Sequence, residues 1–376
     1  MAIERLALAT RKGALILKRN GADWRVVHEG FPGCHVAIVF LDRRSGHLFA
    51  CISDGHFGTK LHRWAEFANS ITVDSSDPQE VWKELTAPAY PEGSKLADGK
   101  DAVLKYPWAM AAGSKKQPGR VYFGSEPGGL FISDDDGDSF RLCEPLWNHP
   151  TRTDKDLPWM GGGLDNPAIH SIVVDPRDES CVRIGISVAG VFQTDDGGAT
   201  WRPTNKGLKA EFLPQPDPEV GHDPHILVQC ESHPDVLWQQ NQCGIFKSDD
   251  GGANWLDVSE TGDDRTAHFG FVIAVDPADG NTAWVVPAES DMVRAAVGRK
   301  LCVCRTTDGG RSWQAFSEGL PQQDCYDFVF RHCLIQNGDE LIFGTACGSL
   351  YHSGNRGESW TTIAKDLPPV YTVIEV

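Results

Sequence analysis

Short runs of alternating hydrophobic residues recur along the chain in one fixed order. A β-branched run ends at an acidic residue, a second run follows, and a glycine-containing connection leads into a third run. An aromatic residue then opens a fourth run. The clearest copy occupies residues 169–176, 181–187, 190–198 and 200–204. Runs of this length, separated by turn residues, are typical of an all-β protein. The pattern predicts units of four strands, here called A to D in chain order.

Six further units extend this pattern to the whole chain. Strand A of five of them is expected at 35–42, 108–113, 225–234, 271–277 and 326–332. The termini supply the remaining unit, because 5–10, 13–21 and 23–27 resemble strands B, C and D and 370–376 resembles a strand A. Closing a ring in this way removes exposed sheet edges. The sequence predicts an all-β fold, a single seven-bladed β-propeller of residues 1–376 whose blade one is built by both termini.

An octapeptide motif recurs where strand C meets strand D. Its copies are Thr194–Trp201 (TDDGGATW), Ser248–Trp255, Thr306–Trp313, Ser133–Phe140 and Ser353–Trp360. An Asp or Asn at the third position can close a tight turn with its own backbone, and the glycine two positions later tolerates a positive φ. The acidic run could instead bind calcium. Fivefold repetition at roughly 40–60 residues favours turn chemistry in a repeat protein.

These motifs resemble those of the Asp-box, or BNR-repeat, proteins, which include sialidases, xyloglucan-acting glycosidases and sortilin-type receptors. Five stretches are similar to the bacterial BNR-repeat group described as glycosyl hydrolases or sialidase-like proteins: 9–13, 219–225, 240–244, 269–277 and 285–291. The resemblance implies a β-propeller with a hydrolase-type activity, and it places the Asp boxes away from the catalytic face.

Net charge and cysteine content indicate which classes of partner and which cellular compartment to expect. A formal net charge of −17 argues against nucleic acid and anionic membranes as partners. The sequence shows no apolar run of about 18 residues and no signal-peptide pattern, so no membrane association is expected. Eleven scattered cysteines favour reduced thiols in a cytoplasmic protein. The oligomeric state is left open.

Histidines gather where strands A are expected to begin. His35, His170, His225 and His268 fall in four blades, and His222 precedes His225. Strand A is innermost in a propeller, so these residues should approach the mouth of the central channel. Together they could bind one divalent transition metal such as zinc, iron, manganese or copper, or serve as general acids and bases. Alternatively, each histidine only fills space in a polar channel and is satisfied by hydrogen bonds, without binding a metal.

Further candidates are expected on the same face, at strand starts and B–C connections. The catalytic candidates are His170, His225, Glu289, Asp291, Tyr326 and Arg11, and the substrate-binding candidates are His56, Glu126, Asn241 and Trp108. These could equally be solvated loop residues. Sialidases use a Tyr nucleophile, and the Phe-Arg-Ile-Pro motif that carries their first arginine is absent from this chain.

These residues predict an enzyme of hydrolase or lyase type that acts on a small polar or sugar-like substrate, such as a glycan. The expected site is a pocket rich in histidines and carboxylates, at the channel mouth opposite the Asp boxes, with a divalent metal as an optional cofactor. Two alternatives remain: a metal-free glycosidase, and a non-catalytic propeller scaffold that binds a protein.

Overall fold

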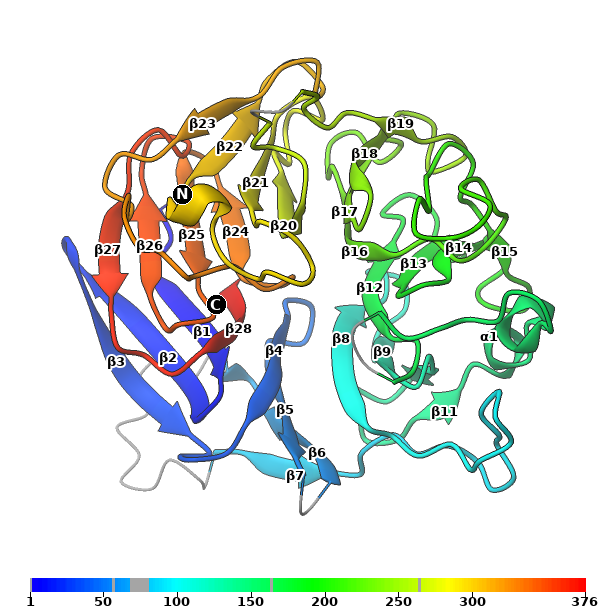
Figure 1. Ribbon diagram of the computed structural model, residues 1–376. Helices are drawn as coiled ribbons and strands as arrows, with labels where there is room; N and C mark the ends of the chain where they lie inside the picture. Colours follow the sequence, from blue (N-terminus) through cyan, green and yellow to red (C-terminus); the bar gives the residue numbers. More distant parts are fainter. Residues whose placement is uncertain (1, 56–57, 68–80, 163–164, 263–264) are drawn as a thin grey trace.

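The computed structural model describes residues 2–55, 58–67, 81–162, 165–262 and 265–376. Seven four-stranded antiparallel sheets stand around a central axis, as Figure 1 shows. The prediction of an all-β, seven-bladed propeller is confirmed. Short helical segments occur at α1 (Glu144–Trp147), η2 (Pro150–Thr153) and η3 (Val297–Arg299).

The strands of the seven blades follow the predicted order. Blade one contains β28 (Val370–Glu375), β1 (Arg5–Thr10), β2 (Gly13–Asn20) and β3 (Asp23–Gly30). Blades two to four contain β4 (Val36–Asp42), β5 (His47–Asp54), β6 (Gly58–Trp64) and β7 (Lys83–Leu85); β8 (Tyr106–Ala112), β9 (Val121–Glu126), β10 (Leu130–Ser133) and β11 (Arg141–Leu142); and β12 (Ile169–Val174), β13 (Val182–Ile186), β14 (Gly190–Thr194) and β15 (Arg202–Pro203). Blades five to seven contain β16 (Pro224–Gln229), β17 (Leu237–Asn241), β18 (Gly244–Ser248) and β19 (Leu256–Asp257); β20 (Gly270–Val275), β21 (Ala283–Pro287), β22 (Val303–Thr306) and β23 (Gln314–Phe316); and β24 (Leu334–Asn337), β25 (Glu340–Gly344), β26 (Leu350–Ser353) and β27 (Thr361–Ala364).

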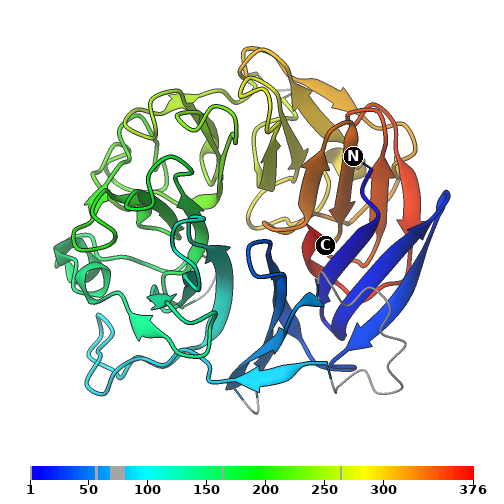
Figure 2. The same cartoon turned by 180° about the vertical axis from the view of Figure 1, so that it is seen from behind.

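The two ends of the chain share blade one. β1 pairs with β2 on one side and with β28 on the other, where Leu6 faces Glu375 and Leu8 faces Val373. Figures 1 and 2 show the blue β1 beside the red β28 from both faces of the ring. The predicted closure is therefore confirmed, and the inner edge of β1 is paired.

The last blade corrects one predicted strand. Residues 326–332 alternate like a strand A, but the innermost strand is β24, which starts at Leu334. Asn337 pairs with Glu340 across a two-residue turn in which Gly338 has a φ of 60°. The two turn residues are Gly338 and Asp339, and a two-residue turn that begins with glycine sets the register of a hairpin. Residues 326–332 consequently form a connection that brings Arg331 and His332 to the central channel.

The octapeptide motifs, called boxes below, form the C–D turns, as predicted. In the box after β14, Asp196 Oδ1 accepts hydrogen bonds from Thr194 Oγ1 (2.7 Å) and from the Thr200 amide (2.9 Å). Asp135, Asp250, Asp308 and Asn355 repeat these two contacts in the other boxes. In each box the side chain at the third position is therefore bonded within the turn itself.

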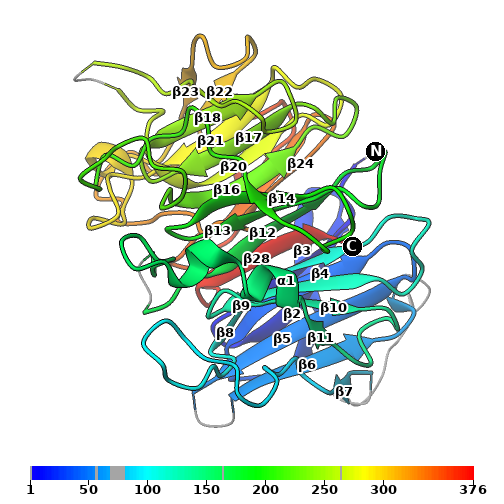
Figure 3. The same ribbon diagram turned by 90° about the vertical axis from the view of Figure 1, so that its right-hand side faces the viewer.

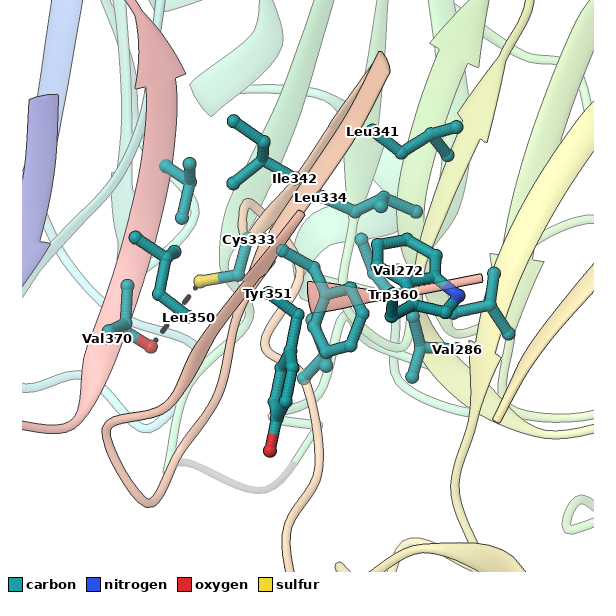
Figure 4. Packing of buried hydrophobic residues seen from close by; sticks show 14 of the residues in the cluster. Val272, Val286, Cys333, Leu334, Leu341, Ile342, Leu350, Tyr351, Trp360 and Val370 are labelled. Carbon is teal, nitrogen blue, oxygen red and sulfur yellow. Dashed lines mark hydrogen bonds between the residues drawn. The ribbon is translucent and has the colours of Figure 1, made fainter. Parts of the chain in front are cut away.

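The cores lie between neighbouring blades. In the cluster of Figure 4, Trp360 and Tyr351 of blade seven lie near Val272 and Val286 of blade six. In the same view Cys333 Sγ donates a hydrogen bond to the Val370 carbonyl (3.4 Å) at the start of the closing strand. Burial of large apolar side chains between sheets is the main stabilising contribution in such a ring.

Strand order fixes the two faces of the ring, which Figure 3 shows from the side. The boxes lie at the C–D turns on one face. The starts of strands A and the B–C connections therefore lie on the opposite face. We call the channel opening on that face the mouth. None of the helices in the described ranges has the length and apolar character needed to cross a bilayer.

Candidate functional site

Two adjoining cavities open at the mouth. The first, of about 400 Å³, is called the acid–base cavity; its polar lining is Asp223, His225, Gln242, Asp291, Arg294 and Arg331. The second, of about 220 Å³, is called the aromatic cavity; its lining includes Tyr106, Trp108, Phe330 and Tyr371. Both are also lined by Gly162, Arg294 and Arg331, so the two cavities meet at these residues.

The polar lining comes from connections that the propeller directs to one face. Asp223 and His225 flank the start of β16, in the segment Gly-His-Asp-Pro-His. Arg294 follows β21 in a B–C connection, and Arg331 precedes β24 in a D–A connection. Because all strands A begin at the mouth, side chains from different blades meet there.

Asp223 is a buried carboxyl group. Its Oδ1 accepts a hydrogen bond from the Val188 amide (3.2 Å), and its Oδ2 lies 4.0 Å from His225 Nε2. Burial raises the pKa of Asp223 to about 6, although the positive charge of Arg331 acts in the opposite direction. A carboxyl group with this pKa is partly protonated near neutral pH and can donate a proton.

His225 is held as one neutral tautomer. Its Nδ1 lies 2.6 Å from the Gly270 carbonyl oxygen. A carbonyl only accepts, so Nδ1 carries the proton and the lone pair is on Nε2. Burial, assisted by the charge of Arg331, lowers the pKa of His225 to about 3. The Phe271 ring stacks on the imidazole at 4.8 Å between centroids and fixes its plane.

Arg331 supplies a buried positive charge. Arg331 is 9% exposed, and within the described part of the chain its guanidinium has no ion pair. It lies over the rings of Trp108 (5.1 Å) and Phe271 (5.6 Å), and burial lowers its pKa to about 10. Arg294 adds a second, exposed cation whose guanidinium lies 5.4 Å from the Phe271 ring. Such a pair of cations favours a ligand that carries an anionic group.

The structure brings several predicted residues to the mouth. His225 and Asp291 line the acid–base cavity, and Trp108 lines the aromatic cavity. His35 lies behind the aromatic cavity, with its ring 4.6 Å from Tyr371, and its Nδ1 accepts a hydrogen bond from Arg11 (3.1 Å). His170 lies deeper, in the channel itself.

Other predicted residues lie outside both cavities. Glu289 accepts a hydrogen bond from the Gly298 amide (3.1 Å), and Tyr326 is 66% exposed beneath the Arg299 guanidinium. Glu126 accepts from Asn166 Nδ2 (3.1 Å), and burial raises the pKa of Glu126.

One further substrate-binding candidate, Asn241, lines neither cavity. Asn241 is used within its own hairpin, where it bonds Gln239 and the Cys243 amide. His56 lies outside the described residues.

The expected metal site does not form in the described structure. His222 Nε2 bonds the Pro218 carbonyl (2.8 Å), and His225 Nδ1 bonds the Gly270 carbonyl. His35 faces Arg11, and the half-buried His268 lies beside the start of β20. No group of three or more His, Cys, Asp or Glu side chains in the described ranges could hold a metal ion. The five histidines, His170 included, therefore do not fit a shared metal, and no step below uses one.

Three site residues were missed by sequence reasoning: Asp223, Arg294 and Arg331. Asp223 stands between two of the singled-out histidines, and its burial was not visible in the sequence. The alternation at 326–332 assigns Arg331 to a strand. The Gly338–Asp339 turn signal places strand A at residues 334–337 and leaves Arg331 in a connection at the mouth.

Comparisons with known proteins show a shared fold. No family model matches this chain, and no curated protein matches it. A GH74 xyloglucanase from Xanthomonas campestris superposes with a TM-score of 0.55 at 17% identity, over 89% of this chain and 46% of that one, so the chain spans less than half of that enzyme.

Two further solved structures cover most of both chains. A candidate 6-phosphogluconolactonase from Bacteroides uniformis gives a TM-score of 0.57 at 11% identity over 100% of both chains. YCF48 bound to D1 peptide gives 0.51 at 14% identity, over 96% of this chain and 84% of that one. At these identities the likeness shows that the chain shares the β-propeller fold of these proteins.

Proposed function

We propose that the protein is a hydrolase that cleaves an ester or lactone of a small, anionic, sugar-like substrate at the mouth. The observation that carries this proposal is the buried Arg331, without an ion pair in the described structure, beside the buried Asp223 and His225. Unpaired buried cations are costly unless a partner arrives. An anionic group of the substrate, bound between Arg331 and Arg294, is such a partner.

Binding of the substrate anion raises the basicity of His225. The charge of Arg331 contributes to the lowered pKa of His225. Once a substrate anion neutralises that charge, the pKa of His225 rises and Nε2 becomes a stronger base. Coupling the base to the anion in this way favours acidic substrates over neutral ones in kcat as well as in binding.

The chemistry then follows from two neighbouring groups. His225 Nε2 takes a proton from water, and the resulting hydroxide adds to the acyl carbon. The acyl C–O bond breaks, and protonated Asp223 gives its proton to the leaving oxygen. The His225 imidazolium then returns a proton to Asp223, whose Oδ2 lies 4.0 Å from Nε2, so both groups return to their starting forms.

The separation of acid and base favours acyl transfer over glycoside cleavage. Inverting glycosidases keep their two catalytic groups roughly 6.5–9.5 Å apart to admit a water on the far side of the sugar. Asp223 and His225 are closer than that. At an acyl carbon, the nucleophile can add and the leaving group can depart on the same side of the substrate. An acid and a base that lie close together, such as Asp223 and His225, can therefore serve both steps.

The aromatic cavity suits the remainder of the substrate. Tyr106, Trp108 and Tyr371 line this cavity beside the two arginines. Aromatic faces bind the apolar faces of sugar-like rings and other flat groups. Two of the structural neighbours, the xyloglucanase and the candidate lactonase, are named for hydrolysis of sugar compounds, which supports this substrate class.

A panel of paired substrates tests the proposal. Lactones and methyl esters of sugar acids that carry a phosphate or carboxylate are compared with their uncharged counterparts. We expect turnover of the charged members, a fall in kcat of at least about 100-fold for His225→Gln and Asp223→Asn, and a raised KM for Arg294→Gln. Equal turnover of charged and uncharged members would contradict the proposal. So would unchanged kcat in His225→Gln, or a wild-type protein that neither binds nor cleaves any charged member.

A further inference from the structure

The central channel beneath the mouth has a chemistry of its own. A cavity of about 410 Å³, here called the throat, extends along the inner faces of strands A. Trp108, His170, Arg331 and His332 line it together with aliphatic side chains such as Ile172. Trp108, Arg331 and His332 also line the aromatic cavity, so the throat adjoins the mouth at these residues.

Buried nitrogen atoms without partners gather in the throat. Trp108 Nε1, His170 Nε2, Arg331 Nε and His332 Nε2 have no hydrogen-bond partner within the described structure. The Pro224 carbonyl approaches the His170 ring without meeting hydrogen-bond geometry. Buried polar groups are nearly always satisfied, so four exceptions in one cavity point to a ligand.

Three of these four nitrogens are donors. Trp108 Nε1 and Arg331 Nε always carry hydrogen. For His170, we assign the tautomer in which the Ser171 hydroxyl donates to Nδ1 (3.0 Å), while Ser171 Oγ also accepts from the Leu227 amide (3.0 Å). Nδ1 is then the acceptor, and Nε2 carries the ring proton. The throat thus presents N–H groups that need an acceptor.

The local charge has the same sign. Arg331 lowers the pKa of His170 and of His332 in addition to that of His225, so its field reaches the throat. The nearest offsetting carboxyl, Asp223, lines the acid–base cavity instead. Water would satisfy the N–H groups but would leave the guanidinium charge uncompensated.

We propose that the throat binds a small monovalent anion of the halide class, held by Trp108 Nε1, His170 Nε2 and Arg331. A single guanidinium compensates one negative charge, and aliphatic walls favour a weakly hydrated ion over a strongly hydrated dianion. This site lies below the substrate site of the proposed function and shares Arg331 with it, so a throat anion and a substrate anion would compete for that guanidinium. Binding of the throat anion requires no substrate.

Bromide is the probe for this site. Crystals of the full chain grown or soaked in sodium bromide are measured at the bromine absorption edge. In solution, the melting temperature is followed against bromide concentration, with sodium isethionate, a larger anion, holding the ionic strength constant. Trp108→Phe removes the N–H and keeps a ring. Trp313→Phe is the matched control, because its Nε1 already donates to the Val258 carbonyl (2.8 Å).

We expect an anomalous peak within hydrogen-bond reach of Trp108 and Arg331. The bromide-dependent rise in melting temperature should occur in the wild type and in Trp313→Phe, with at least tenfold weaker apparent affinity in Trp108→Phe. Density for water alone in the throat would overturn the proposal, and so would an equal bromide response in Trp108→Phe. These measurements use no substrate, so a protein that binds bromide but cleaves no ester would overturn only the proposed hydrolase.

Discussion

At the scale of single residues, Asp223 links stability to pH. Its pKa in the folded protein, about 6, lies above the ordinary value of 3.8. The folded state therefore favours the protonated form, and stability contributed by that preference is lost as pH rises through about 6. Asp223→Asn cannot ionise, and its amide oxygen can still accept from the Val188 amide.

The stability difference between Asp223→Asn and the wild type should accordingly grow in favour of the variant between about pH 4 and pH 7. A shift of about two pKa units corresponds to roughly 3 kcal/mol at the upper end. Denaturant unfolding at a series of pH values measures this difference. A difference that stays constant across the range would show that the carboxyl group is not buried as described.

A second prediction at this scale concerns the Asp boxes. Asp308→Ala loses the hydrogen bonds to Thr306 and Ser312 and should lower the free energy of unfolding by about 1 kcal/mol. Asp308→Asn should retain most of the stability, because Asn355 serves the fifth box and its Nδ2 donates to Ser359 (2.9 Å). Urea unfolding of the two variants makes the comparison, and equal losses would contradict the turn role.

At the scale of elements, glycines without side chains allow the backbones of neighbouring blades to approach closely. Gly207 has a φ of +92° and lies against the Trp255 carbonyl, while the Trp255 amide donates to the Lys206 carbonyl (2.8 Å). Gly319 repeats this contact with Trp360 of the last blade. A side chain at either glycine would collide with the backbone of the next blade.

Gly207→Ala should therefore cost about 3–5 kcal/mol, since it combines backbone strain with a collision. Gly197→Ala is the matched control, because Gly197 also has a positive φ (+71°) but has nothing within 4 Å of an added Cβ. The control should cost only about 1–2 kcal/mol. Thermal or denaturant unfolding distinguishes the two, and similar losses would remove the inter-blade contact from the explanation.

The elements also show what could be predicted from the sequence. The strands were predictable because each blade repeats one alternation, and the boxes because five blades repeat one turn, as in 169–204. The exception at 326–332 alternates equally well, and only the Gly338–Asp339 turn distinguishes it from the true strand. The site was less predictable, because its charges lie on connections of unequal length that follow no repeat. Of the predicted residues, His225 and Asp291 line the acid–base cavity and Trp108 lines the aromatic cavity, whereas Glu289 and Tyr326 lie outside both.

At the scale of the whole molecule, the ring depends on its closing strand. Deleting Pro369–Val376 removes β28, which leaves the inner edge of β1 unpaired. The deletion also opens a buried cluster that contains Leu8 of blade one, Leu350 of blade seven and Val373 of β28 itself. The hydrogen bond from Cys333 Sγ to the Val370 carbonyl is lost with the strand.

We expect the deleted protein to be insoluble or to melt at least about 10 °C below the parent, because a buried strand and two sheet interfaces are lost. Circular dichroism melting and size-exclusion chromatography measure this. A truncated protein that is monodisperse and melts like the parent would contradict the role of β28 in holding the ring together.

The pairing of β28 with β1 also sets the timing of folding during translation. The two strands share a sheet, yet at about 5–20 residues per second the ribosome makes them roughly 20–75 seconds apart. Throughout that interval β1 has no inner neighbour, and the nascent blades form an open arc. Blade one is complete only after residues 370–375 have left the ribosome. A chain whose synthesis stops before them keeps an open ring, and the unpaired edge of β1 can pair with other chains.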